Sequence, residues 1–298
     1  MDGETQALVW LAAAKWVTDV GLLWMVGALV FYAISRFAGV APPRSTVGQA
    51  GVVLAVLVVG CAGRLWAQTY ATFGLDEPVT GELIRLVAED TRWGGRWVLQ
   101  ASSLAGAALL AGLVPVAPRW GWPALGVATL LMIGTAPLTG HAVAGETVWW
   151  PMLLQGLHLL GAGAWLGTLG VLLASGLVSL RAEPGQAASV VERFSPLALG
   201  AAATVGVTGG LTAILYVSEF SQLWTSTYGR VLLLKTTLFL GTAMVGAYNW
   251  RKVRPRLGAP DGVAALRCAG AFELTIAVVL LAVTAWLVHL PMPGEGHH

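Results

Sequence analysis

Eight apolar segments, each long enough to cross a lipid bilayer as a helix, divide this sequence of 298 residues. The hydrocarbon core of a bilayer is about 30 Å thick, which takes about 20 helical residues. Unpaired backbone groups are too costly in lipid for loops or open sheets, so we expect all eight segments to be helices. They lie at residues 7–35, 47–73, 95–114, 121–138, 151–179, 195–218, 229–250 and 266–290. The sequence therefore predicts an all-α, polytopic membrane protein, with residues 1–298 forming a single transmembrane domain.

The composition excludes several other classes of protein. Hydrophobic residues make up 56% of the chain and charged residues 11%, whereas soluble domains carry about 25% charged residues. No basic stripe interleaved with aromatic residues is present, so we expect no nucleic-acid partner. Cys61 and Cys268 stand alone without a CxxC spacing, which argues against a disulfide scaffold or a thiolate zinc site. The expected environment is the lipid bilayer.

The distribution of basic residues predicts the orientation. Lysine and arginine concentrate on the cytoplasmic side of membrane proteins, and here alternate loops collect Arg36, Arg44, Arg119, Arg181, Arg193, Arg251, Lys252, Arg254, Arg256 and Arg267. The opposite loops are mainly acidic. We therefore expect both termini to face the periplasm, with the protein in the inner (cytoplasmic) membrane of a bacterium. The acidic start MDGETQ lacks the basic region of a secretory signal, so the first apolar segment is expected to remain as a span.

One segment between spans is expected to lie on the outer surface. Residues 76–96 carry Leu83, Leu86 and Val87 at helical spacing between charged residues. This pattern is typical of a short amphipathic helix at the membrane interface.

Ionisable residues within spans need a physical reason, because burying a charge in lipid costs a few kcal/mol or more. Six such residues are Lys15, Asp19, Arg64, His158, Lys235 and Glu273. Lys15 and Asp19 are four residues apart on one helix face, which predicts an internal ion pair. Arg64 and Lys235 have no partner in their own helices, so each must meet an anion elsewhere, such as Asp19, or extend to the interface.

The remaining polar residues of the spans have more than one reading. Glu273 is expected to pair with Arg267, to cap a neighbouring helix or to have a function. Arg230 begins a span and is expected to be interfacial. Three threonines recur every four residues, and such hydroxyls usually bond back to their own helix; they are Thr204, Thr208 and Thr212.

Three histidines point to a metal site at the outer face. His141 lies in an outer loop, His158 about two turns into the fifth span, and His289 at the outer end of the eighth span. A single histidine in a helix is more often a satisfied core group, but these three can approach one surface. Met152 and Met292 add thioethers beside the imidazoles. Thioether with imidazole suits Cu(I), and imidazole alone suits Cu(II) or zinc.

Several stretches resemble the copper resistance protein D (CopD) family, most clearly over residues 137–293. They are GHA at 140–142, LHLLGAGAWLG at 157–167, RFSPLAL at 193–199, YGRVLLLKTTLFLGTAMVGAYNWRKVRPRL at 228–257 and FELTIAVVLLAVTAWLVHLPMP at 272–293. The resemblance implies an inner-membrane protein that moves copper from periplasm to cytoplasm with a small periplasmic copper carrier of the CopC type. The positions that match the family's pattern are His141, His158, Arg230, Lys235, Asn249 and Glu273.

Three functions remain open at this point. The leading one is copper transport without enzymatic activity, through an outward-facing His/Met site. The second is a redox cytochrome binding haem b, with His158 and either His141 or His289 as axial ligands. The third is a copper-insertion or scaffold factor that binds the metal without moving it. The cations Lys15, Arg64 and Lys235 would repel Cu(I). Either the carboxylates of Asp19 and of the outer helix neutralise these cations, or the transported species is anionic or complexed.

Overall fold

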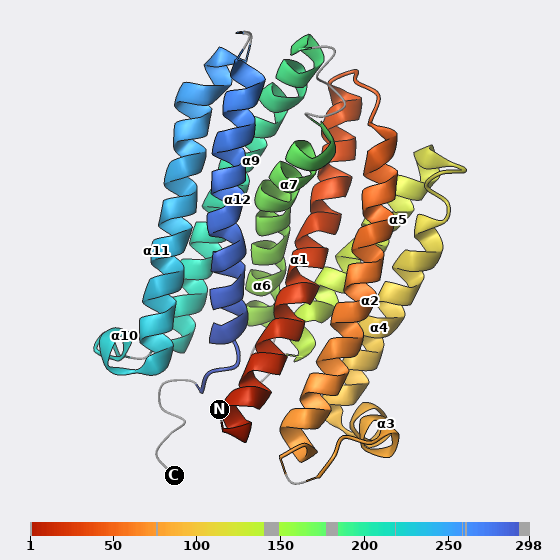
Figure 1. Ribbon diagram of the computed structural model, residues 1–298, viewed down its shortest axis with the longest axis vertical. Coiled ribbons are helices and arrows are strands. Elements are labelled where there is room, and N and C mark those ends of the chain that lie inside the picture. Colours follow the sequence, from red (N-terminus) through yellow and green to blue (C-terminus); the bar gives the residue numbers. More distant parts are fainter. Residues whose placement is uncertain are drawn as a thin grey trace.

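The first half of the chain forms four long helices and one short one. The computed structural model describes residues 2–75, 77–139, 149–176, 184–217, 219–257, 259 and 261–291. Its first half contains α1 (Gly3–Phe37), α2 (Arg44–Phe73), the short α3 (Gly81–Asp90), α4 (Arg92–Ala111) and α5 (Pro118–Thr135), which a 3₁₀ turn, η1 (Ala136–Thr139), extends. These helices stand side by side along the long axis, apart from α3, which lies across one end (Figure 1).

In the second half, two of the long helices change their winding. The helix α6 (Trp149–Ala162) continues through the π-helical η3 (Gly163–Gly167), α7 (Thr168–Val171) and the π-helical η4 (Leu172–Gly176). The helix α9 (Pro184–Tyr216) precedes the single turn α10 (Gln222–Thr225). Next, α11 (Thr227–Tyr248) continues as the π-helical η5 (Asn249–Val253) and the 3₁₀ turn η6 (Arg254–Arg256), before α12 (Gly262–Leu287).

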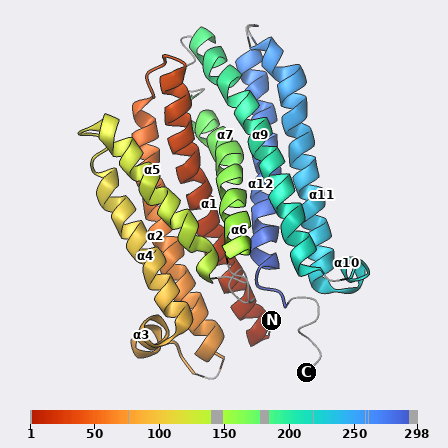
Figure 2. The same ribbon diagram turned by 180° about the vertical axis from the view of Figure 1, so that it is seen from behind.

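The all-α membrane fold is confirmed: within the described residues the elements are all helical. Among the residues that the structure describes, seven helices are long and apolar enough to span a membrane, against eight predicted spans. The segment missing from that set is α4, whose 20 residues extend about 30 Å at 1.5 Å per residue. Arg96, Gln100 and two serines make it less apolar, yet it runs alongside α2 and α5 (Figures 1 and 2). The start of α1 and the end of α12 lie at the same end of the bundle (Figure 1).

The helix α1 lies at the centre of the bundle, and glycines allow the closest approach to it. A Cβ atom added to Gly27 would lie 2.1 Å from the carbonyl carbon of Gly167, and one on Gly163 would lie 2.5 Å from Cβ of Val26. Small residues drive this kind of backbone contact in membranes, where van der Waals packing replaces the hydrophobic effect. Gly163 and Gly167 thus both bring η3 close to α1. At Gly210, by contrast, nothing lies within 4 Å of an added Cβ.

Within the predicted surface segment 76–96 the structure has a short helix with narrower bounds. It is α3, in which Val87 is 2% exposed and packs on the bundle, whereas Leu86 is 43% exposed and points away from it. Thr91 then caps α4 by accepting a hydrogen bond from the backbone of Gly94. The last residues assigned to the surface segment therefore belong to α4.

Candidate functional site

His158 is held in one tautomer by a hydrogen bond between α6 and α9. Its Nδ1 lies 3.0 Å from Oγ1 of Thr208, and that hydroxyl donates its hydrogen to the carbonyl of Thr204 at 2.7 Å. A hydroxyl has a single hydrogen, so Thr208 accepts from His158 and Nδ1 carries the proton. The carbonyl of Val205 is a further acceptor for the ring. Nε2 is then the nitrogen whose lone pair can bind a metal.

The surroundings of His158 are half-buried and contain one cation. The residue lies nine positions after Trp149, the first residue of α6, or about 13 Å along the axis. A Cβ on Gly209 would lie 3.4 Å from Cε1 of the ring, so glycine lets the imidazole lie against α9. The charge of Lys235 on α11 acts on the ring. Thr208 was predicted to bond only to its own helix, and no pattern in the sequence indicates its contact with His158.

Of the other two predicted histidine ligands, the structure describes His289. His289 follows the last residue of α12 by two positions, and its Nδ1 donates to the carbonyl of Ala285 at 2.8 Å. It therefore lies just beyond the end of α12, whereas His158 lies inside α6. His141 and Met292 lie outside the described residues. Those residues contain no group of three His, Cys, Asp or Glu side chains that could hold a metal.

A second set of polar residues lies between α1, α2 and α4. The predicted ion pair between Lys15 and Asp19 is confirmed. Arg64 is 7% exposed and donates to Oε1 of Gln100 at 2.9 Å and to Oγ1 of Thr139 at 2.7 Å. Its expected direct contact with Asp19 or extension to the interface is wrong, since neutral oxygens hold the guanidinium and Asp19 acts on it only through space.

The structure does not support neutralisation of these cations by acids of the surface helix. On α3, Glu89 pairs with Arg85 in an exposed ion pair. The charges of Lys15 and Asp19 act on the ammonium group of Lys235. Lys235 forms no ion pair with any described carboxylate. Arg230, predicted to be interfacial, is exposed at the start of α11.

Glu273 forms a separate buried cluster between α12, η3 and η5. It is 3% exposed, and its two oxygens accept from Nε1 of Trp165 at 2.9 Å and from Nδ2 of Asn249 at 2.7 Å. The expected pairing with Arg267, or a helix-capping role, is wrong. Both donors lie on π-helical segments, η3 and η5, and π turns inside helices occur frequently at functional sites. Trp165 was not among the predicted site residues.

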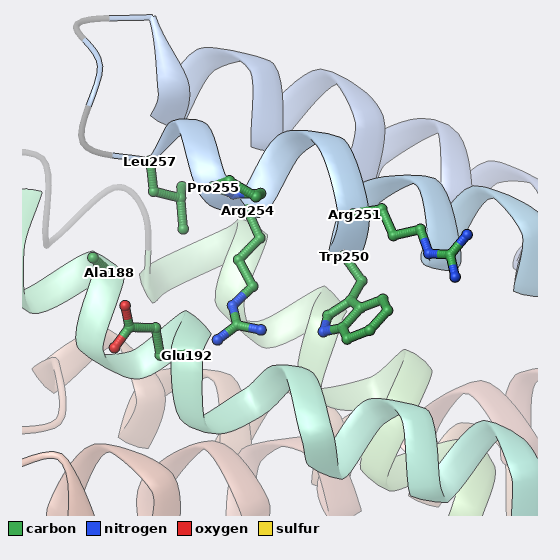
Figure 3. Close-up of a pocket in the computed structure, with 7 residues that line it drawn as sticks. All are labelled: Ala188, Glu192, Trp250, Arg251, Arg254, Pro255 and Leu257. Carbon is green, nitrogen blue, oxygen red and sulfur yellow. The ribbon is translucent and has the colours of Figure 1, made fainter.

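A cavity of about 550 Å³ opens at the end of the bundle away from the termini. Arg254 extends towards Glu192 and Trp250 lies beside it, whereas Arg251 points away (Figure 3). The cavity contains no imidazole or thioether among its lining residues, which are Ala188, Glu192, Trp250, Arg251, Arg254, Pro255 and Leu257. It is therefore not a candidate for the metal site.

Two family comparisons cover most of the chain. Residues 5–150 match the family described as copper resistance protein D-like, N-terminal domain, and residues 188–287 match copper resistance protein D. The chain belongs to the copper resistance protein D family. The membership extends the resemblance at residues 137–293 into the N-terminal half. It places Lys15, Asp19 and Arg64 in one matched region and Lys235 and Glu273 in the other, while His158 lies between them.

One curated relative is the copper transport protein CutJ of Bacillus subtilis (strain 168). It is 28% identical over 220 residues, which cover 71% of this chain and 39% of that protein. The chain thus spans about two fifths of the length of its relative. No solved structure matches the chain. Together with the seven apolar helices, these matches identify a multi-pass membrane protein of a copper-related family.

Proposed function

We propose that this protein transports copper across the inner membrane of a bacterium, from periplasm to cytoplasm, without acting as an enzyme. The observation that carries the proposal is the imidazole of His158 inside a membrane-spanning helix. Its Nδ1 donates to the Thr208 hydroxyl, so Nε2 presents a lone pair. Metal-binding histidines are commonly oriented by such a contact at the second ring nitrogen. The family membership and the relative named as a copper transport protein support copper as the cargo.

The proposed route begins at the end of the bundle where α1 starts. His289 and Met152, with His141 and Met292, receive copper from a soluble carrier of the CopC type, and ligand exchange delivers it to His158. Imidazole and thioether groups bind Cu(I) well. Exchange requires each site to bind weakly enough to release the ion, which fits a pathway with few ligands at each step.

The cation Lys235 sets a condition on the transported species. Its charge acts on His158, so a bare Cu(I) ion there is repelled. Arg64 forms its hydrogen bonds where α2, α4 and η1 meet. The hydrogen bond of His158 lies elsewhere, between α6 and α9. We therefore propose that copper passes His158 together with an anionic ligand that faces Lys235.

Copper uptake into proteoliposomes tests the proposal directly. The replacement His158→Ala should reduce the uptake rate by about tenfold or more. Even residues that only hydrogen-bond to a metal ligand contribute about 10- to 100-fold to metal affinity. Gln155→Ala is the matched control, since Gln155 is a half-buried polar residue less than one turn away. Uptake by His158→Ala equal to that of the control would refute the role of His158.

Two further measurements separate the other functions. A Soret band in the visible spectrum of the purified protein would replace the transport proposal with haem binding. Copper binding by the wild-type protein with no uptake beyond that of empty liposomes would indicate a scaffold or insertion factor. Uptake dependent on His158, with no haem spectrum, is the expected result.

A further inference from the structure

The carboxyl group of Glu273 is buried in the bundle without a cationic partner. Its oxygens accept from two neutral donors, the indole of Trp165 and the amide of Asn249. Several described elements that pack against α12 carry charges, but no ion pair reaches Glu273. The charged residues on those elements are Glu4, Lys15, Asp19, Arg36, Arg230, Lys235, Arg251, Lys252, Arg254 and Arg256, together with Arg267 on α12 itself. A carboxylate so placed is costly unless a proton can neutralise it.

The amide of Asn249 is the second unusual feature of the cluster. Asn249 is 8% exposed, and its Oδ1 is buried without a hydrogen-bond partner. A half-turn of the amide about its last torsion exchanges Nδ2 and Oδ1 at nearly the same positions. In that orientation the oxygen faces Oε2 of Glu273 and can accept a hydrogen from it. The same side chain therefore complements the ionised carboxylate in one orientation and the protonated acid in the other.

The ligand that fits this cluster is a proton. Two N–H groups are directed at the carboxylate, and they would repel a metal cation. The space around Glu273 is also restricted, because a Cβ on Gly246 would lie 3.0 Å from Oε1. Magnesium and calcium need at least six oxygen ligands, whereas a proton on Oε2 needs a single acceptor.

The cavity shown in Figure 3 adjoins the cluster along the chain. Trp250, which lines that cavity, directly follows Asn249 on η5. A residue of the cavity wall and a residue of the cluster are therefore consecutive in the sequence.

We propose that Glu273 is a proton-binding site that exchanges one proton with water in this cavity. Oε2 gains the proton as a new O–H bond, the Asn249 amide turns so that Oδ1 accepts it, and release reverses both changes. No other bond forms or breaks. Coupling of this proton to copper movement rests on the proposed function, whereas protonation itself does not.

Infrared difference spectroscopy on the metal-free, full-length protein tests the proton site. The C=O stretch of a protonated acid is followed across roughly pH 4 to 9, the range over which buried glutamates titrate. The replacement Glu273→Gln should remove one pH-dependent band, and Asn249→Ala should shift the frequency of that band. The glutamine amide can donate to Asn249 Oδ1 as the protonated acid does, so this variant is expected to fold.

The matched control is Glu89→Gln, which alters an exposed carboxylate on α3. The pH-difference spectrum of the Glu89→Gln protein should retain the band that Glu273→Gln removes. A Glu273→Gln protein that retains every titrating band of the wild type would overturn the proposal. So would a band that Asn249→Ala leaves at the same frequency, because the amide would then not contact the protonated acid.

Uptake into proteoliposomes with and without a pH gradient tests the coupling separately. Wild-type uptake should respond to the gradient, and Glu273→Gln uptake should not. A variant that keeps the full response would overturn the coupling while leaving the infrared result intact. Absence of uptake by the wild type would refute the proposed transport function, and the proton site would still stand or fall by its infrared band.

Discussion

Replacement of Thr208 by valine should weaken copper binding without changing the ligand. Valine keeps the branched shape of threonine and removes the hydroxyl that accepts from Nδ1 of His158 at 3.0 Å. Partners of metal-binding histidines are typically worth 10- to 100-fold in affinity, or about 1.4 to 2.7 kcal/mol. The carbonyl of Val205 remains as an acceptor for the ring. We therefore expect the lower end of this range, about tenfold, for Thr208→Val.

The same helix supplies the control for this measurement. Thr204 also donates to the carbonyl four residues earlier, Gly200, at 2.9 Å, so Thr204→Val removes an equivalent helix contact away from the imidazole. Thr208→Ser keeps the hydroxyl and should retain the wild-type affinity. The assay is competition for Cu(I) between the purified protein and a chromophoric chelator of known affinity. Equal losses in Thr208→Val and Thr204→Val would refute the tautomer argument, as would a Thr208→Val affinity within about twofold of the wild type.

Three further predictions concern other parts of the bundle. Lys235→Met should tighten Cu(I) binding in the same competition assay, because it removes a positive charge that acts on His158; weaker binding would contradict the proposed electrostatics. Gly27→Ala should lower thermal stability by at least about 3 kcal/mol through overpacking, whereas Gly210→Ala, with open space around its Cβ, should not. Side-chain and backbone hydrogen bonds from Thr5 lower the pKa of Asp2. The Asp2 carboxylate therefore caps the N-terminus of α1 at neutral pH, and this cap is lost as the pH falls through the lowered pKa. Hydrogen exchange in the first turn should therefore rise in acid, but not in Asp2→Asn.

The sequence predicts where the helices of this fold lie better than it predicts how many of them are apolar enough to span the membrane. Length and apolarity define a helix whatever its neighbours are, so the bounds of α1, α2 and α12 follow from the residues alone. The exception is α4, where Arg96 and Gln100 interrupt the apolar pattern. Their polar groups are satisfied by other helices, since Arg96 donates to the carbonyl of Leu138 and Gln100 accepts from Arg64. These hydrogen bonds form only when the helices pack together, so the sequence of one helix does not predict them.

The same limit explains which parts of the candidate site could be predicted. His158 and Glu273 are conspicuous in apolar segments, because burying either group in lipid requires a reason. Their partners are not conspicuous: Thr208 is 50 residues from His158, and Trp165 is 108 residues from Glu273. Threonine and tryptophan are ordinary residues in membrane helices. Only the rotation of each helix about its axis decides which of them face the ionisable group.

The hydrogen bonds of His158 and Glu273 each join a helix with a large buried share to helices with a small one. In the most apolar stretches of α1, α2, α5 and α6, 44% to 67% of the residues are buried, against 11% to 28% in α9, α11 and α12. His158 joins α6 to α9, while Glu273 on α12 joins η3 to η5. Apolar side chains gain little by leaving lipid for a helix interface, so hydrogen bonds and close backbone contacts hold such boundaries. The contact of Gly27 with Gly167 fixes η3 against α1, and the hydrogen bonds of His158 and Glu273 attach α9 and α12 to this centre.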